Sequence, residues 1–282
     1  MDRYVVIGNP VAHSQSPFIH AEFARQTGQQ LEYGRLWCPP DGFAATLRAF
    51  AAEGGRGCNV TMPFKFDAFH LVAEHTPRGA LAGACNALRL DAERWLGDNT
   101  DGAGLLRDIE RNAGVSVRGR RVLLIGAGGA AAGVLGPLLA AQPGQLVVAN
   151  RTPQRADELL RTHHAAVEAT RSKTIDLRAG SLADCGTGFE IVVNATASSM
   201  VGAAAPVSPR ALAPGALAID LMYGPAAQGF VAWAEAHGAT ARDGLGMLVE
   251  QAAEAFALFR GVEPDTGPVL AALRRRMAEP AA

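Results

Sequence analysis

A glycine-rich turn in the middle of the chain directly follows an apolar run. The run is Val122–Ile125, and the turn with the Ala-rich stretch after it is Gly126–Ala131, with the spacing G-x-G-x-x-A. A strand, a tight turn and a helix in this order bring backbone N–H groups and a helix N-terminus to the pyrophosphate of a dinucleotide. The pattern predicts a Rossmann-like nucleotide-binding unit. The long stretch of chain before it must form something else, and we expect that part to hold the substrate.

The strand that follows indicates which dinucleotide is bound. Its apolar residues, Leu146–Ala149, lead into Asn150, Arg151 and Thr152, where a unit that binds NAD usually places an Asp or Glu against the ribose 2′-OH. No carboxylate stands at these positions. Arg151, with Arg155 one helical turn later, instead offers cations that suit a 2′-phosphate. The sequence favours NADP(H) over NAD(H), and solvated arginines at a helix start are the alternative interpretation.

Composition and charge argue against several other classes of protein. The chain has 282 residues, enough for one large or two ordinary domains, and its net charge of −1 gives no reason to expect a nucleic-acid partner. The four cysteines are too scattered for a C-x-x-C site or a disulfide framework, and no signal peptide precedes the first strand-like run. We therefore expect a cytoplasmic protein without a metal.

One stretch raises the question of a membrane span. Val122–Ala141 carries no charge and is long enough to cross a bilayer. Its glycines and Pro137 lower its hydrophobicity and make it a poor spanning helix. We expect no membrane partner.

Two helical segments divide the chain. Residues 103–111 precede the glycine-rich turn, and residues 245–260 follow Leu217–Asp220, which we interpret as the last strand of the nucleotide unit. The chain is expected to start in one domain, cross into a second and return. This predicts an α/β fold of two domains separated by a cleft, an N-terminal substrate domain and a Rossmann-like NADP-binding domain. The predicted bounds are residues 1–102 completed by 241–282 for the first domain, and 103–240 for the second.

Three polar clusters in the first domain are candidates for the chemistry. They are Ser14–Pro17, Asn59–Lys65 and Asn99–Gly102, and each lies where a strand is expected to pass into a helix. In an open α/β sheet such positions form the carboxyl edge of the strands, where ligands bind. We therefore expect the reaction to take place at this edge.

Helix capping is the alternative interpretation for two of these clusters. Ser16 before Pro17 fits an N-cap followed by a proline at the first helical position, and Asp101 fits a cap for the helix after it. Lys65 is different, because a lysine just inside a helix N-terminus opposes the helix dipole. An enzyme that reduces a ketone with hydride needs a proton donor at the carbonyl oxygen, and a lysine ammonium supplies one at neutral pH. We interpret Lys65 as that donor, with Asp101 orienting it or sharing the proton.

With these residues together, the chain resembles the shikimate dehydrogenase family along nearly its whole length. The matching stretches, in chain order, are Gly8–Pro10, His13–Pro17, Asn59–Lys65, Gly83–Asn86, Asn99–Gly102, the glycine-rich turn, Asn150–Thr152, Asn194–Thr196 and Asp243–Leu248. So many separate matches in order are more specific than a glycine loop alone. The resemblance implies two α/β domains around a cleft and the reversible NADPH-dependent reduction of 3-dehydroshikimate to shikimate, on the route to chorismate and the aromatic amino acids.

The resemblance also implies roles for individual residues. Lys65 and Asp101 would form the catalytic pair at the C–O group. The substrate would be held at its carboxylate by Ser14, Ser16 and Tyr223, and at its ring hydroxyls by Thr61, Asn86 and Gln251. The cofactor would be held at its pyrophosphate by Gly126, Ala127, Gly128, Gly129, Ala130 and Ala131, at its adenosine phosphate by Asn150, Arg151, Thr152 and Arg155, and on its nicotinamide side by Thr196, Met222, Gly244 and Met247. A solvated helix glutamine and two core methionines are the alternatives for Gln251, Met222 and Met247.

The chain departs from the family pattern at several positions. Gln15 stands between the two serines in place of a common lysine, Ala21 stands where Asn or Gln is common, and Ala132 stands where a basic residue often follows the glycine-rich turn. The stretch Ala197–Met200 lacks the glycine that is more usual there. Because glycine takes conformations that serine does not easily adopt, the sequence leaves open the backbone path near the nicotinamide.

Three other functions fit part of the pattern. A quinate-accepting relative would share most motifs, but we find neither a wider pocket on the carboxylate side nor an acidic residue at the 2′ position. A folate-linked dehydrogenase could also place a lysine in its cleft, although the match at Asn99–Gly102 argues against it. A non-catalytic NADP-binding sensor is disfavoured because Lys65 and Asp101 are both present. A monomer and a homodimer both stay open.

Overall fold

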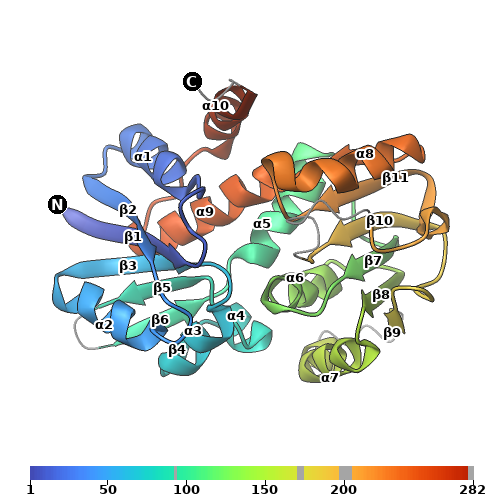
Figure 1. Cartoon of the computed structure of the whole chain (residues 1–282), viewed down its shortest axis with the longest axis horizontal. Helices are drawn as coiled ribbons and strands as arrows, with labels where there is room; N and C mark the ends of the chain where they lie inside the picture. Colours follow the sequence, from blue (N-terminus) through green and yellow to red (C-terminus); the bar gives the residue numbers. More distant parts are fainter. Residues whose placement is uncertain (92–93, 170–174, 197–204, 279–282) are drawn as a thin grey trace. The chain divides into compact units, whose positions relative to one another are not determined.

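The computed structural model describes residues 1–91, 94–169, 175–196 and 205–278 (Figure 1). It divides into two compact units, the first formed by Met1–Gly104 with Leu248–Ala282 and the second by Leu105–Met247. Each unit contains one six-stranded sheet with helices packed on it. The two-domain α/β fold expected from the sequence is confirmed.

The first sheet is mixed, and one of its strands runs against the others. The strand order is β2-β1-β3-β5-β6-β4, and every pair is parallel except the two pairs made by β5. Because β5 is reversed, it begins at the edge where β3 and β6 end, and Ala87 pairs with both Asn59 and Asp98. The strands are β1 (Asp2–Gly8), β2 (Leu31–Trp37), β3 (Gly55–Val60), β4 (Glu74–His75), β5 (Ala87–Leu90) and β6 (Trp95–Asp98).

Both faces of the first sheet are covered by helices, because residues of one strand alternate between two cores. In β1, Val5 and Ile7 belong to the core that also holds residues of α2 and α3, whereas Tyr4 stacks on Phe259 of α9 with ring centroids 5.0 Å apart. Figure 1 shows α2 and α3 on one side of this sheet and α1 and α9 on the other. The helices are α1 (Ser16–Thr27), α2 (Phe43–Ala52), α3 (Lys65–Leu71), α4 (Pro77–Ala82), α5 (Asp101–Arg107), α9 (Leu245–Arg260) and α10 (Thr266–Ala278).

The two capping interpretations are wrong. Ser16 is the first residue of α1, and Gln15 holds the N-cap position without a side-chain cap bond. The Ser16 backbone N–H donates instead to Ser14 Oγ at 3.3 Å. Asp101 is likewise the first residue of α5, and its backbone N–H donates to Asn99 Oδ1 at 3.1 Å. In each turn an earlier side chain accepts the N–H group that has no partner within the helix, which leaves the side chains of Ser16 and Asp101 available for other partners.

The second sheet is parallel throughout, as expected of a Rossmann-like domain. Its strand order is β12-β11-β10-β7-β8-β9. In β7, Val122 and Leu124 enter the core shared with α6 and α7, whereas Leu123 and Ile125 enter the core shared with α8, so both faces of the strand are buried. The strands are β7 (Arg121–Ile125), β8 (Gln145–Asn150), β9 (Asp176–Ser181), β10 (Phe189–Asn194), β11 (Leu212–Asp220) and β12 (Thr240–Arg242). The helices are α6 (Gly129–Ala140), α7 (Pro153–Ala169), α8 (Gln228–Ala236), η1 (Asp108–Asn112), η3 (Pro209–Ala211) and η4 (Gly224–Ala227).

Two elements of the second unit differ from the sequence prediction. The segment Leu217–Asp220 is not the last strand, because β12 pairs beyond it through Leu217 and Thr240. The helical segment predicted over 103–111 begins at Asp101 and changes at Asp108 into the π-helix η1. Asp108 is fully buried there, and its Oδ1 accepts a hydrogen bond of 3.0 Å from Arg242 of β12. A tertiary ion pair therefore joins the two unexpected elements.

Among the described residues, no helix is both long and apolar enough to cross a membrane. The uncharged stretch Val122–Ala141 folds into β7, the glycine-rich turn and α6, a helix of 12 residues that contains Pro137.

Candidate active site

The three polar clusters lie at one edge of the first sheet. The first joins β1 to α1, the second joins β3 to α3, and the third joins β6 to α5. Because β1, β3 and β6 run in the same direction, all three clusters follow the carboxyl ends of their strands. The placement of the candidate residues at this edge is as the sequence predicts.

Lys65 and Asp101 form an ion pair at this edge. Lys65 is the first residue of α3, and its Nζ donates to Oδ2 of Asp101, the first residue of α5. The side chain of Lys65 is 16% exposed and that of Asp101 is 7% exposed. The carboxylate offsets the unfavourable position of the lysine at a helix N-terminus. The pair is shielded from bulk water but not closed off, which suits groups that exchange a proton with a bound molecule.

Asn86 holds the second oxygen of Asp101. It lies just before β5, and its Nδ2 is 2.8 Å from Asp101 Oδ1, 2.9 Å from Thr100 Oγ1 and 3.1 Å from Gln251 Oε1. Its own Oδ1 accepts the backbone N–H of Thr100 at 2.8 Å. The Asp101 carboxylate is therefore oriented from both sides, by an ammonium group on one oxygen and an amide on the other.

Gln251 reaches this network from α9. It is 8% exposed, and its Nε2 donates to the Leu248 carbonyl at 2.9 Å, so its Oε1 is directed to Asn86 and Thr100. The interpretation of Gln251 as a solvated helix residue is wrong. Gly104 allows this approach, because a Cβ there would lie 2.7 Å from the Gln251 backbone nitrogen.

The two serines of the first cluster lie together, and the backbone of Ser14 is bonded by a residue that the sequence did not single out. Ser14 and Ser16 are buried, and their hydroxyl oxygens are 3.2 Å apart. Arg35 of β2 donates to the Ser14 carbonyl through Nε at 3.0 Å and through one Nη at 2.6 Å. No local signal marked Arg35, because its partner is 21 residues away and β2 shows no polar cluster.

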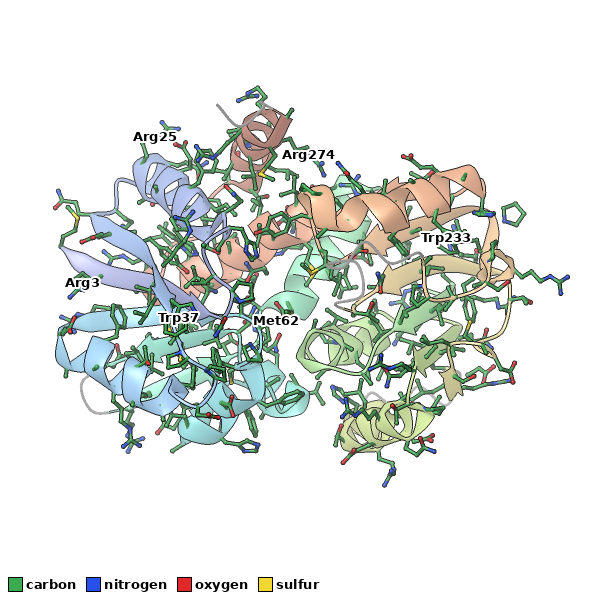
Figure 2. The ribbon with its side chains drawn as sticks, in the orientation of Figure 1. Arg3, Arg25, Trp37, Met62, Trp233 and Arg274 are labelled. Carbon is green, nitrogen blue, oxygen red and sulfur yellow. The ribbon has the colours of Figure 1, made fainter. Side chains whose placement is uncertain are left out.

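Two further polar residues, Tyr33 and Asn59, form a hydrogen-bonded chain that ends at the backbone carbonyl of Asn86. Tyr33 of β2 donates through its hydroxyl to Asn59 Oδ1 at 2.7 Å, and Asn59 Nδ2 donates to the Asn86 carbonyl at 3.2 Å. Asn59 belonged to the predicted cluster 59–65 without a role of its own. Thr61 follows β3, is half-buried, and donates its backbone N–H to the Ile7 carbonyl at 3.0 Å. The next residue, Met62, is 38% exposed in the turn that leads to Lys65 (Figure 2).

The glycine-rich turn of the second unit has the geometry that a pyrophosphate requires. Gly126 follows β7 with φ of 114°, and a Cβ there would lie 3.1 Å from the Ala195 carbonyl oxygen. Gly128 is the N-cap of α6, is exposed, and has open space where a Cβ would stand. Gly129 begins a helix of 12 residues, whose first N–H groups have no partner within the helix. The predicted residues Gly126, Ala127, Gly128, Gly129, Ala130 and Ala131 thus lead from β7 into the first turn of α6, whose N-terminus is open to an anion at the exposed Gly128.

The predicted phosphate-binding arginines lie at the carboxyl end of the neighbouring strand. Asn150 ends β8 and donates through Nδ2 to the Thr152 carbonyl at 2.9 Å, and the Arg155 N–H donates to the same carbonyl at 3.0 Å. This turn presents Arg151 and Arg155 at the surface, where both side chains are exposed. Two exposed cations beside the glycine-rich turn of a parallel sheet match a dinucleotide with a 2′-phosphate.

The residues predicted for the nicotinamide side are connected by two polar side chains that lacked an assigned role. Asn194 at the end of β10 accepts from the Thr196 hydroxyl at 2.7 Å and donates to Asp220 Oδ2 at 2.9 Å. Asp220 Oδ1 in turn accepts the Met222 backbone N–H at 2.8 Å. The Gly244 N–H donates to the Met222 carbonyl at 2.8 Å.

Two other predicted site residues of this region, Met247 and Tyr223, differ in how far they are exposed. Met247 is 6% exposed and packs in the core with Leu124 and Ile219, which agrees with its interpretation as a core methionine. Tyr223 is half-buried at the N-cap of η4. The stretch Ala197–Met200, where the chain departs from the family pattern, lies outside the described residues.

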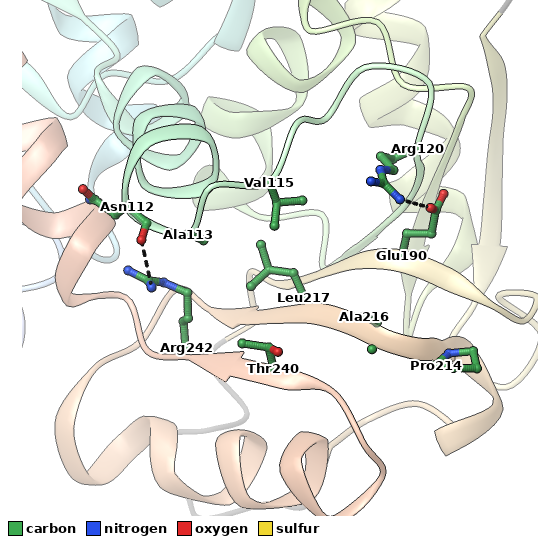
Figure 3. A pocket seen from close by; sticks show the side chains of 11 residues that line it. Asn112, Ala113, Val115, Arg120, Glu190, Pro214, Ala216, Leu217, Thr240 and Arg242 are labelled. Carbon is green, nitrogen blue, oxygen red and sulfur yellow. Dashed lines mark hydrogen bonds and ion pairs between the residues drawn. The ribbon is translucent and has the colours of Figure 1, made fainter.

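A cavity of about 310 Å³ opens at the other end of the second sheet (Figure 3). It is lined by residues at the amino ends of the strands, among them Arg120, Glu190 and Thr240, whereas the glycine-rich turn follows the carboxyl end of β7. Arg120 pairs with Glu190, and Arg242 donates to the Asn112 carbonyl at 3.4 Å. The charges on its wall already have protein partners, and its position separates it from the predicted cofactor site.

Comparisons with known proteins agree with this geometry. The family model for the shikimate dehydrogenase substrate binding domain matches residues 6–88. The model for shikimate / quinate 5-dehydrogenase matches residues 108–207, and that for the shikimate 5′-dehydrogenase C-terminal domain matches residues 244–274. The matched regions include Lys65, the glycine-rich turn and Gln251.

Individual relatives are similar over almost their whole length. A shikimate dehydrogenase (NADP(+)) from Methylibium petroleiphilum is 62% identical over 279 residues, which cover 97% of this chain and 94% of the relative. The crystal structure of an Ael1 enzyme from Pseudomonas putida has 44% sequence identity and a TM-score of 0.84, over 97% of this chain and 98% of that chain. The shikimate 5-dehydrogenase from Thermus thermophilus, in complex with NADP(H) and shikimate, has 30% identity and a TM-score of 0.81, over 98% of this chain and 99% of that chain. This chain belongs to the shikimate dehydrogenase family.

Proposed function

We propose that the protein is an NADP-dependent oxidoreductase that catalyses the reversible reduction of 3-dehydroshikimate to shikimate, a step toward chorismate and the aromatic amino acids. The observation that carries the proposal is the Lys65–Asp101 pair, whose carboxylate is oriented by Asn86 in a chain that matches shikimate dehydrogenases over almost all of its length. Relatives named for NADP(+), and a relative solved with NADP(H) and shikimate, support the cofactor and the substrate.

The proton transfer is assigned to the Lys65–Asp101 pair. When bound, NADPH supplies a hydride to the carbonyl carbon, which becomes the C–H carbon of the alcohol. Lys65 donates a proton to the carbonyl oxygen as negative charge develops there, and Asp101 holds the ammonium in place and takes part in its reprotonation. In the reverse direction the pair accepts the hydroxyl proton of shikimate.

The substrate is proposed to be held by neutral donors at the edge of the first sheet. Ser14 and Ser16, with hydroxyls 3.2 Å apart, suit the two oxygens of a carboxylate. Thr61, Asn86 and Gln251 are assigned to the ring hydroxyls. Tyr223 belongs to the other unit, and its part in carboxylate binding rests on the family resemblance alone.

The described residues fit NADP(H). The open space at Gly128 and the helix N-terminus at Gly129 suit the pyrophosphate, and the exposed Arg151 and Arg155 suit the 2′-phosphate, with Asn150 and Thr152 shaping the turn between them. On the nicotinamide side we assign Thr196, Met222 and Gly244. The family resemblance adds Met247, which packs in the core of the second unit.

The absorbance of NADPH at 340 nm tests the proposal directly. We expect the purified protein to form NADPH from shikimate and NADP⁺, with much lower rates when quinate replaces shikimate or NAD⁺ replaces NADP⁺. Comparable rates with quinate would favour a dual-specificity dehydrogenase. Binding of NADP⁺ without turnover of either acid would favour a non-catalytic sensor and overturn the proposal.

We further propose that the protein acts in the cytoplasm on a small molecule, as a monomer or homodimer, without nucleic-acid or membrane partners. The near-neutral net charge of −1 supports the absence of a nucleic-acid partner. Light scattering of the purified protein decides between the two oligomeric states.

A further inference from the structure

Arg78 joins two elements that carry residues of the candidate site. It lies in α4, and its Nε and one Nη donate to the two oxygens of Asp98 at 2.8 and 2.6 Å. Its other Nη donates to Glu254 Oε2 at 2.5 Å. Asp98 is the last residue of β6, and Glu254 belongs to α9. One planar guanidinium group therefore bridges a strand end and a helix.

Asp98 connects Arg78 to the turn that carries Asp101. Asp98 is 1% exposed, and its Oδ1 also accepts the Asn99 backbone N–H at 2.8 Å. Asn99 Oδ1 in turn accepts the Asp101 N–H at 3.1 Å. Two hydrogen bonds thus connect Asp98, which Arg78 holds, to Asp101, the first residue of α5.

Glu254 connects Arg78 to Gln251. The two residues are three positions apart in α9, so their side chains lie on the same side of the helix. The bond from Arg78 to Glu254 therefore restrains the side of α9 that carries Gln251, whose amide oxygen accepts from Asn86. Arg78 is 33% exposed and Glu254 16% exposed, so the bond between them is largely shielded from water.

We propose that Arg78 is a positioning residue for the reaction: by holding Asp98 and Glu254 together, it sets Gln251 against Asn86 and Asp101. The inference rests on the proposed function of that site. Arg78 makes two separate contributions. Its bond to Glu254 orients Gln251, which is assigned to substrate binding, and its bonds to Asp98 orient the turn that carries Asp101.

Glu254→Gln is the more selective variant, because it keeps the size of the side chain, weakens the Arg78–Glu254 bond and leaves the Arg78–Asp98 bonds in place. We expect the KM for shikimate to rise about 3- to 20-fold, as for coupled residues of one hydrogen-bond network, with kcat and the KM for NADP⁺ changed less than about two-fold. Arg78→Lys supplies a compact point charge that cannot reproduce the three bonds that the planar guanidinium makes to the two carboxylates. It should raise the KM for shikimate at least as much and also lower kcat.

A double-mutant cycle distinguishes positioning from a general loss of stability. If Glu254 acts through Gln251, then Glu254→Gln should have no further effect on shikimate binding in a Gln251→Ala background. Glu74→Gln is the matched control, because it breaks the exposed Glu74–Arg94 pair of 2.7 Å in the same unit and should leave the KM for shikimate unchanged. Melting temperatures of all variants show that the assays compare folded proteins.

Shikimate binding measured by calorimetry gives the same comparison without turnover. Unchanged shikimate affinity in both Glu254→Gln and Arg78→Lys would overturn the inference while leaving the proposed function intact. An equal loss of affinity in the wild-type and Gln251→Ala backgrounds would also overturn it. Failure of the wild-type protein to bind shikimate would overturn the proposed function and the inference with it.

Discussion

The carboxylate of Asp101 is held between Lys65 Nζ on one oxygen and Asn86 Nδ2, at 2.8 Å, on the other. Lys65 and Asp101 are 36 residues apart in the chain and become neighbours because α3 and α5 both begin at the same edge of the first sheet. The Asp101 carboxylate thus orients the ammonium group and is itself oriented by Asn86. Such preorganisation is what a proton donor needs, since rigid placement lowers the cost of reaching the reactive geometry.

Lys65→Ala should lower kcat for shikimate oxidation about 10²- to 10⁴-fold, the usual contribution of a general acid or base, while NADP⁺ affinity stays nearly constant. Asp101→Asn should act similarly, because an amide neither holds the ammonium charge nor accepts its proton. Steady-state kinetics at 340 nm give both quantities. Asp67→Asn, an exposed change in the same helix α3, is the control and should keep the wild-type kcat. Wild-type kcat in either site variant would remove that residue from the catalytic pair.

Arg151→Ala should weaken NADP⁺ binding about 10- to 100-fold and hardly affect NAD⁺, which lacks the phosphate that the guanidinium would bind. Fluorescence or calorimetric titration of both cofactors measures the difference. Arg161→Ala, an exposed arginine farther along α7, should leave both affinities unchanged. An equal loss for the two cofactors would show that Arg151 acts through the fold of its turn and not through the phosphate.

Gly126→Ala should lose both stability and NADP⁺ affinity, whereas Gly128→Ala should lose NADP⁺ affinity alone. At Gly126, φ of 114° and a Cβ only 3.1 Å from the Ala195 carbonyl oxygen make any side chain strained. This variant should lose about 1–3 kcal/mol of unfolding free energy, together with NADP⁺ affinity. At Gly128 a Cβ meets nothing in the protein, so Gly128→Ala should keep its stability and lose NADP⁺ affinity, because the methyl group would occupy the space assigned to the pyrophosphate. Denaturation curves and cofactor titrations test both; unchanged NADP⁺ affinity in Gly128→Ala would contradict the assignment.

The protein should prefer shikimate over quinate by at least about 10²-fold in kcat/KM, or about 2.7 kcal/mol. Quinate carries an extra hydroxyl on the carbon that bears the carboxylate. If the buried Ser14 and Ser16 both bind the carboxylate, as proposed, they would hold it close to the start of α1 and leave little space for that hydroxyl. Ser16→Ala should raise the KM for shikimate with a smaller effect on NADP⁺. Thr27→Val at the far end of α1 is the control. Similar kcat/KM values for the two acids at saturating NADP⁺ would contradict this prediction.

The free energy of unfolding should decrease in mild acid, because protonation of the buried His20 favours the unfolded chain. Burial lowers its pKa to about 3, it stacks on Tyr33 at 4.1 Å, and neither ring nitrogen has a hydrogen-bond partner among the described residues. Because the pKa in the folded protein lies below the ordinary value of about 6.5, protonation favours the unfolded chain. The contribution of His20 is complete above pH 6.5 and decreases as the pH falls from there toward 3, by up to about 1.4 kcal/mol per pH unit.

Urea denaturation of the wild-type protein and His20→Phe between pH 6.5 and 4.5 measures this slope. The variant keeps an aromatic ring and removes the titrating group, so its unfolding free energy should depend less on pH. His70→Gln, at an exposed position in α3, should retain the wild-type slope. Identical slopes for the wild-type protein and His20→Phe would rule out the contribution of His20.

The sequence by itself determined the features that reside in short, contiguous segments. The glycine-rich turn after Val122–Ile125 specified a Rossmann-like unit, because a strand, a tight turn and a helix are encoded within about ten residues. The parallel second sheet agrees with that prediction. Lys65 is a candidate because a lysine at a helix N-terminus opposes the helix dipole, and the three polar clusters lie at predicted strand-to-helix transitions. The same local patterns carry the family resemblance and hence the proposed activity.

Only the tertiary structure decided how distant segments meet. The reversal of β5 brings Asn86 to the carboxyl edge of β3 and β6, and no local pattern states that a strand runs antiparallel. Gln251 reaches Asn86 across 165 residues, and Arg78 reaches Glu254 across 176. Strand direction and helix rotation are selected by the burial of whole faces against one another, a property of the packed domain and not of any single segment. For that reason the sequence identified the residues of the pair Lys65–Asp101, while the side chains that orient the pair became visible only in the fold.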